Sequence, residues 1–176
     1  MRIVAGKYKG LQVPLPKVGD IRPTTDRAKE SLFNILIHKL DLPSLKVLDL
    51  FCGSGNMSIE FASRGCLSVT GVELSSQVVK QVQNLITQRE IENVEIVKAD
   101  VFRFIVKSTE KYDIIFADPP YALAYIKDLP ENIFEANLLS PDGLLIIEHA
   151  SQLSWNHPSW LESRNYGQSV FSFFSI

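Results

Sequence analysis

Residues 47–60 read VLDLFCGSGNMSIE, a short apolar run that ends in a glycine-rich turn and continues into a helix-like segment. Strand, tight turn and helix in this order are typical of an α/β sheet that binds its ligand at the carboxyl ends of the strands. A pyrophosphate-binding turn needs GxGxxG, but Ser58 stands in place of the third glycine. Asp49, at the strand end, would repel a phosphate and suits a cationic amino group.

Outward from this stretch, apolar strand-like runs alternate with helical patterns. Near-continuous apolar strands separated by helices indicate an α/β, mainly parallel sheet with helices on both faces. We expect a final, antiparallel edge strand at 169–176. The other strands are expected at 46–51, 68–74, 94–99, 112–117 and 143–149, and the helices at 25–40, 55–64, 76–90, 101–108 and 124–139.

The N-terminal residues form a distinct basic part of the chain. Residues 1–14 are expected to form a small hairpin, and a loop rich in proline and glycine follows, so we predict an extension at 1–23 and a main domain at 24–176. Residues 1–30 hold seven basic against three acidic groups, within a chain of net charge −2. A basic arm on an acidic body fits a phosphate-contacting segment, and charge alone equally fits a solvated surface.

The composition bounds the class of protein. At 176 residues, 45% of them hydrophobic, the chain fits one globular domain. Neither a signal peptide nor an apolar run of membrane-spanning length is evident, so a cytoplasmic protein is expected. Cys52 and Cys66 lie outside any CxxC pattern, so we expect no metal site.

Two further acidic residues end the second and third strands. Glu73 is placed to accept both hydroxyls of a ribose, and Asp100 the amino group of an adenine. S-adenosylmethionine carries an α-ammonium and a sulfonium and no phosphate, and so fits three such carboxylates. Each acid alone could instead cap a helix. The predicted cofactor-binding residues are Asp49, Phe51, Gly53, Gly55, Glu73, Leu74, Asp100, Val101 and Phe102.

The fourth strand ends in the catalytic candidates Asp118, Pro119, Pro120 and Tyr121. Two prolines hold a rigid, extended turn and leave the Pro119 carbonyl free of the sheet. That carbonyl and the Asp118 carboxylate are two acceptors for the two hydrogens of an exocyclic amino group, and Tyr121 offers a face for a stacked base. Alternatively, the tetrapeptide is simply a turn.

VLDLFCGSGNMSIE and DPPY resemble class I amino-methyltransferases that act on nucleic-acid bases. The head MRIVAGKYKG and the segment RPTTDRAKESLFNIL (22–36) more narrowly resemble the RsmD family of bacterial 16S rRNA guanine-N2 methyltransferases, and this resemblance runs through almost the whole chain. It implies a Rossmann-like domain with a small N-terminal extension, S-adenosylmethionine as the donor, and one guanine in small-subunit rRNA as the target, within an assembled or partly assembled 30S particle.

The resemblance also gives the basic arm a purpose. It implies rRNA phosphate contacts by Arg2, Lys7, Lys9, Arg22, Arg27 and Lys29. Thr24 and Thr25 would lie over the methionine end of the cofactor pocket. Local pairing of Arg22 and Arg27 with Asp26 and Glu30 is the alternative.

Several other interpretations stay open. A DNA adenine-N6 or cytosine-N4 methyltransferase would use the same chemistry, although 176 residues leave little space for duplex recognition. A protein glutamine methyltransferase would carry Asn at position 118, and a non-catalytic RNA-binding assembly factor would keep only the fold. Glu148 and His149 end the fifth strand, where they either line the site or are solvated. Trp155 and Trp160 are expected to pack a C-terminal loop.

Overall fold

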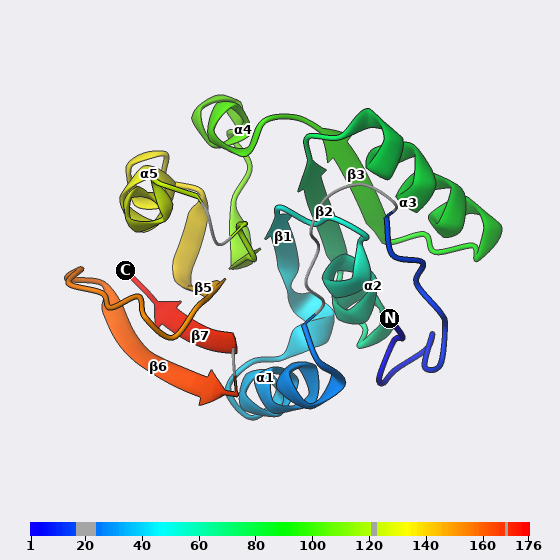
Figure 1. Ribbon diagram of the computed structural model, residues 1–176, viewed down its shortest axis with the longest axis horizontal. Coiled ribbons are helices and arrows are strands. Elements are labelled where there is room, and N and C mark those ends of the chain that lie inside the picture. Colours follow the sequence, from blue (N-terminus) through cyan, green and yellow to red (C-terminus); the bar gives the residue numbers. More distant parts are fainter. Residues whose placement is uncertain (17–23, 121–122, 168) are drawn as a thin grey trace.

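The computed structural model describes residues 1–16, 24–120, 123–167 and 169–176 (Figure 1). Over these residues the chain forms a seven-stranded sheet in the order β3-β2-β1-β4-β5-β7-β6. Strands β1 to β5 are parallel to one another, β7 is antiparallel to β5, and β6 is antiparallel to β7. The strands are β1 (Lys46–Leu50), β2 (Ser68–Glu73), β3 (Val94–Lys98), β4 (Tyr112–Ala117), β5 (Leu139–His149), β6 (Trp160–Tyr166) and β7 (Ser169–Phe174).

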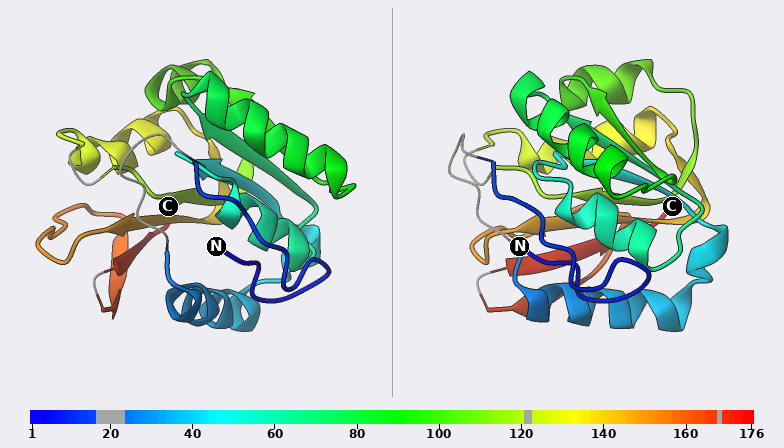
Figure 2. Two further views of the ribbon diagram at one scale, coloured as in Figure 1. Left: turned by 45° about the vertical axis from the view of Figure 1, so that its right-hand side comes forward. Right: turned by 90° about the vertical axis from the view of Figure 1, so that its right-hand side faces the viewer.

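Helices cover both faces of this sheet (Figure 2). Apolar side chains of α1, α2 and α3 share one buried cluster, and those of α4 and α5 share a second cluster. The expected α/β class is therefore confirmed. The helices are α1 (Asp26–Lys39), α2 (Asn56–Ser63), α3 (Ser76–Gln88), α4 (Val101–Lys107) and α5 (Leu129–Glu135), with 3-10 turns at Leu42–Ser44 and Ile126–Asp128.

The helix boundaries follow capping residues. Thr25 caps α1, because its side chain accepts a hydrogen bond from the backbone N–H of Ala28 at 3.2 Å. Ser75 caps α3 in the same way. The single helix expected at 124–139 is wrong: a 3-10 turn precedes α5, which begins at Leu129 with Pro130 in its first turn, a position where proline's missing N–H costs nothing.

The C-terminal end of the sheet differs from the prediction. The strand at 169–176 is predicted at the edge, but β7 lies between β5 and β6. Strand β6 is mainly exposed, since its sequence WLESRNY is largely polar and shows no apolar run. Trp160 therefore belongs to an edge strand and not to a loop. None of the helices in the described ranges is long and apolar enough to cross a membrane.

The N-terminal segment lies on α2. Its backbone is paired across the predicted hairpin, with Ile3 N–H donating to the Leu11 carbonyl at 2.9 Å, but the pairing is one isolated bridge between Arg2 and Gln12 and not two strands. Ile3 and Val13 are buried in the cluster that α1 and α2 share. The division of the chain at residue 23 stays a prediction.

Candidate functional site

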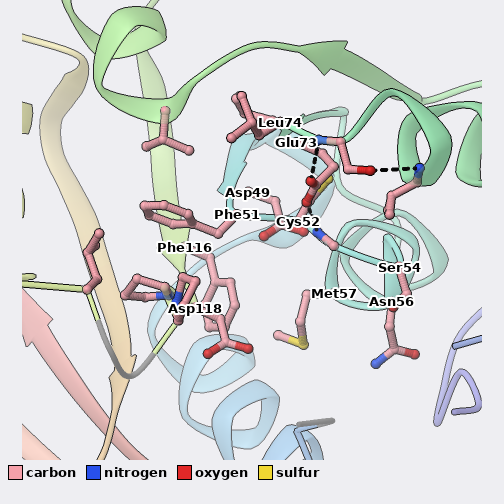
Figure 3. A pocket seen from close by; sticks show the side chains of 18 of the residues that line it. Asp49, Phe51, Cys52, Ser54, Asn56, Met57, Glu73, Leu74, Phe116 and Asp118 are labelled. Atoms are coloured by element: carbon pink, nitrogen blue, oxygen red, sulfur yellow. Dashed lines mark hydrogen bonds between the residues drawn. The ribbon is translucent and has the colours of Figure 1, made fainter. Parts of the chain in front are cut away.

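The carboxyl ends of β1, β2 and β4 open onto a cavity of about 510 Å³ (Figure 3). The order of the sheet reverses between β1 and β4, and this is where open α/β sheets bind ligands. Residues that were predicted separately along the chain meet here. The predicted site residues that line the cavity are Asp49, Phe51, Gly53, Glu73, Leu74, Asp100, Val101, Phe102, Asp118, Pro119 and Pro120.

Other lining residues escaped the prediction. Ser54, Asn56 and Met57 stand at the start of α2, where only the glycines were singled out, and Phe116 is a core residue of β4 that also reaches the cavity. Met1 comes from the N-terminal segment, which carried no signal for such a position. Tyr121 and Arg22 lie outside the described residues.

Gly55 shapes the turn but does not line the cavity. Its φ is +74°, and a Cβ there would lie 2.5 Å from Cγ1 of Val82 on α3. The predicted role of Gly55 in cofactor binding stays a prediction; the structure shows that glycine is needed here for backbone conformation and close helix packing. Gly53, with φ +50°, does line the cavity.

Asp49 is a buried carboxyl at the end of β1, only 1% exposed. The Ser58 hydroxyl donates to its Oδ2 at 2.5 Å. Burial, and to a lesser degree the charge of Glu73, raise the pKa of Asp49 to about 7. The serine that breaks the GxGxxG pattern is thus the partner of this carboxyl. A cationic group in the cavity would favour the ionised form.

Glu73 connects the glycine turn to α3. Its Oε2 accepts from the Gly53 N–H at 3.2 Å, and its Oε1 from the Ser75 N–H at 2.7 Å (Figure 3). Asp100 caps α4, accepting from the Arg103 N–H at 3.0 Å, and lines the cavity as well. Asp100 therefore caps a helix, as the alternative interpretation expected, and it also lines the cavity.

Asp118 directly follows β4, half-buried in the cavity wall. Its backbone N–H donates to the Leu50 carbonyl at 3.4 Å. Burial raises the pKa of Asp118 well above its usual value, and the negative charges of Glu148 and Asp49 raise it further. A carboxyl in such surroundings binds a proton strongly.

Glu148 and His149 point to opposite faces of β5. Glu148 is 2% exposed and accepts a hydrogen bond at 2.7 Å from the hydroxyl of Thr24, which lines the cavity. His149 is buried among β7 and Trp155, with Ser172 Oγ 2.6 Å and the Trp155 indole nitrogen 3.0 Å from its Nε2. Neither residue is solvated, and His149 does not line the cavity.

Lys29 is not available to RNA, which corrects its predicted role. Its side chain is fully buried, and Nζ donates to the Arg2 carbonyl at 2.6 Å and lies 3.3 Å from Glu60 Oε2. Glu60 also binds the Arg64 side chain at 2.9 Å. The side chain of Lys29 therefore holds the N-terminal segment, α1 and α2 together; no charge count distinguishes a buried lysine from an exposed one.

The other described basic candidates are exposed. Arg2 pairs with Asp26 at 2.7 Å, while Lys7, Lys9 and Arg27 lie on the surface. Thr25 borders a second, smaller cavity with Arg27 and not the main one, which corrects its expected place over the cofactor pocket. Thr24 lines the main cavity, and its place over the methionine end of a cofactor stays a prediction.

The cavity fits a nucleoside with a cationic amino-acid tail. Its volume is within the range of small-ligand sites, and its lining combines apolar side chains with Asp49, Glu73 and Asp100. In the described residues no group of three or more His, Cys, Asp or Glu side chains could hold a metal ion.

This fold, with acidic residues ending three strands around a glycine turn, defines the class I S-adenosylmethionine-dependent methyltransferases. The chain belongs to the family described as conserved hypothetical protein 95, whose model matches residues 1–175, and which is the RsmD family.

Individual relatives agree with this assignment. The chain is 31% identical to ribosomal RNA small subunit methyltransferase D of Buchnera aphidicola, over 88% of this chain and 78% of that protein. It is 30% identical to the protein of the same name in Escherichia coli, over 84% and 74%. A solved hypothetical protein of Thermus thermophilus superposes with a TM-score of 0.88 at 26% identity, over 100% of this chain and 99% of that one.

Proposed function

We propose that this chain transfers a methyl group from S-adenosylmethionine to the exocyclic N2 of one guanine in small-subunit rRNA. The observation that carries the proposal is the shared cavity of Asp118 and the carboxylates that end β1, β2 and β3. The carboxylates that end β1, β2 and β3 would hold the methyl donor there, and Asp118 would hold the base that accepts the methyl group beside it.

The cofactor half of the site follows the strands outward. Asp49 would bind the α-ammonium of the donor, Glu73 the ribose hydroxyls and Asp100 the adenine amino group, with Val101 and Phe102 against the ring. When bound, the cofactor supplies an electrophilic methyl group. Glu73 already binds two backbone N–H groups, so its position is fixed before any ligand arrives.

The acceptor half is the Asp-Pro-Pro turn. The Asp118 carboxylate and the Pro119 carbonyl would accept the two hydrogens of the guanine amino group, which withdraws the nitrogen lone pair from the ring and directs it at the methyl group. Asp118 would then take a proton from the methylated amine. Tyr121, which lies outside the described residues, would stack on the base.

The substrate is inferred from the relatives and from the surface charge. The relatives named above carry rRNA small subunit methylation in their names. Exposed Arg2, Lys7, Lys9 and Arg27, with Arg22, would contact phosphates of the RNA. An assembled or partly assembled 30S particle in the cytoplasm is the proposed partner.

A methylation assay tests the proposal. The protein is incubated with labelled donor and small subunits from cells that lack the modification, and the methylated base is mapped by mass spectrometry. We expect one N2-methylguanine. With Asp118→Ala the rate should fall by about 10²–10⁴, while the affinity for S-adenosylhomocysteine, measured by calorimetry, stays nearly unchanged.

Other outcomes would favour the alternatives. Transfer to duplex DNA and not to ribosomal particles would indicate an adenine-N6 or cytosine-N4 enzyme. Cofactor binding without transfer to any nucleic acid would indicate an assembly factor. Equal loss of cofactor binding and transfer in Asp118→Ala would mean that Asp118 is misassigned.

A further inference from the structure

The charged side chains that line the main cavity in the described ranges are all acidic. They are Asp49, Glu73, Asp100 and Asp118, and no lysine, arginine or histidine of these ranges is among the lining residues. S-adenosylmethionine carries an α-carboxylate beside its α-ammonium group. Acidic side chains attract the ammonium and repel the carboxylate, so the carboxylate needs hydrogen-bond donors from another part of the wall.

Backbone donors are available at the start of α2. The first hydrogen bond within this helix runs from the Ile59 N–H to the Gly55 carbonyl at 2.9 Å, so the N–H groups of residues 56–58 precede it. Asn56 and Met57, the first two residues of the helix, line the cavity. The partial positive charge of a helix start favours an anion. A carboxylate is therefore favoured at this part of the wall.

Asn56 adds a side-chain donor at the same place. The residue is 4% exposed and lines the cavity. Its Oδ1 accepts a hydrogen bond from Lys29 Nζ at 3.4 Å, while its Nδ2 has no hydrogen-bond partner among the described residues. No fully buried side-chain nitrogen or oxygen of these residues lacks a partner, so Nδ2 is in contact with the open cavity. In Figure 3 this nitrogen is turned toward the side on which Met57 and Asp118 lie. An acceptor in the cavity would give Nδ2 the partner that the described protein does not provide.

Lys29 fixes the orientation of the Asn56 amide. Its ammonium group has three N–H donors, and three acceptors surround it among the described residues: the Arg2 carbonyl at 2.6 Å, Glu60 Oε2 at 3.3 Å and Asn56 Oδ1 at 3.4 Å. The side chains of Lys29 and Glu60 are fully buried. Rotating the amide by half a turn would place its NH2 group against the ammonium, where neither group could accept a hydrogen bond. The nitrogen is therefore presented to the cavity before any ligand arrives.

We propose that Asn56 binds the α-carboxylate of the cofactor through its amide nitrogen, beside the backbone N–H groups that begin α2. This inference rests on the cofactor half of the proposed function and adds a specificity-determining residue to it. Asp49 takes the ammonium and Asn56 the carboxylate of the same amino-acid end. A neutral donor binds the carboxylate without neutralising Asp49, whose charge the ammonium needs.

Two ligands that differ only in the carboxylate test this role. S-adenosylhomocysteine has the whole amino-acid end, and its decarboxylated analogue keeps the ammonium but lacks the carboxylate. Calorimetry measures the affinity of the native protein and of Asn56→Ala for both ligands. We expect S-adenosylhomocysteine to bind the variant about ten- to a hundredfold more weakly, which is the loss of one hydrogen bond to a charged group. The affinity for the analogue should not change.

Two further variants serve as controls. Asn84→Ala makes the same change at an exposed position of α3 and should leave both affinities as they are. Asn56→Asp removes the donor and adds a negative charge, so it should favour the analogue over S-adenosylhomocysteine more strongly than Asn56→Ala does. Equal losses for the two ligands in Asn56→Ala would assign Asn56 a structural role and overturn the proposal.

A nuclear magnetic resonance measurement on the native protein needs no variant that binds. The side-chain amide of Asn56, labelled with ¹⁵N and assigned by its absence from the spectrum of Asn56→Ala, should shift further with S-adenosylhomocysteine than with the analogue. Equal shifts would contradict a hydrogen bond to the carboxylate, even if rRNA is methylated. A larger shift with S-adenosylhomocysteine, together with no methylation of rRNA, would refute the proposed function and support the role of Asn56.

Discussion

Replacing Asp49 by Asn should stabilise the ligand-free protein while weakening its hold on the cofactor. Asn has nearly the same shape, and its carbonyl oxygen can still accept the hydrogen bond from Ser58. The change removes only the ability to ionise. It therefore isolates the free energy that is required to keep a carboxylate in an interior position.

The magnitude follows from the pKa of Asp49, which rises from 3.8 to about 7 on folding. Between these values the folded state binds a proton that the unfolded state releases, so native stability decreases as the pH rises. At 1.36 kcal/mol per pH unit the loss reaches about 4 kcal/mol at pH 7 and stays constant above it. Asn at this position carries no such loss.

Urea unfolding followed by circular dichroism at pH 4.5, 6.0 and 7.5 measures the difference. The variant should gain stability over the native protein as the pH rises, by up to about 4 kcal/mol at pH 7.5. Asp142→Asn makes the same change at an exposed position of β5 with φ +62° and should show no such trend. A difference between the Asp49→Asn variant and the native protein that does not vary with pH would refute the reasoning.

The same variant tests the role of Asp49 toward a cationic ligand. S-adenosylhomocysteine keeps the α-ammonium group, which would compensate the buried carboxylate. Calorimetry at pH 7.5 should therefore show weaker binding by the variant. Unchanged affinity would remove Asp49 from the cofactor site.

Two further changes probe the frame around the site. Lys29→Met should lower the free energy of unfolding by about 3 kcal/mol, because buried Glu60 would lose one of the two ionic partners that it has among the described residues. Urea unfolding measures this loss, and adding Glu60→Gln should restore part of it. An unchanged free energy of unfolding in the single variant would contradict the pairing. Gly55→Ala should cost about 2 kcal/mol, since its φ is positive and its Cβ would meet Val82. That cost, measured by thermal unfolding, should be smaller on a Val82→Ala background, and an equal cost on both backgrounds would show that the contact is irrelevant.

Much of the fold was predictable because its signals are local. Apolar runs placed β1 to β4 and the start of α1 within about two residues, and the parallel rule then placed the strand ends on one edge. Strand β6 escaped prediction because an exposed edge strand needs no apolar pattern. Because β6 was not predicted, β7 was expected at the edge of the sheet, whereas it lies between β5 and β6.

The amino-acid sequence by itself determined the α/β class, the glycine turn and the acidic residues at three strand ends. These features follow from the spacing of apolar residues and from the residue types that adjoin one another in the sequence. Only the tertiary structure decided what each charge does. Lys29 and Glu60 neutralise one another out of contact with water, Ser58 is bound to Asp49, and Glu148 stands beside Asp118. Burial and distance between segments far apart in the chain fix these roles, since the same residue types exposed to solvent would interact weakly.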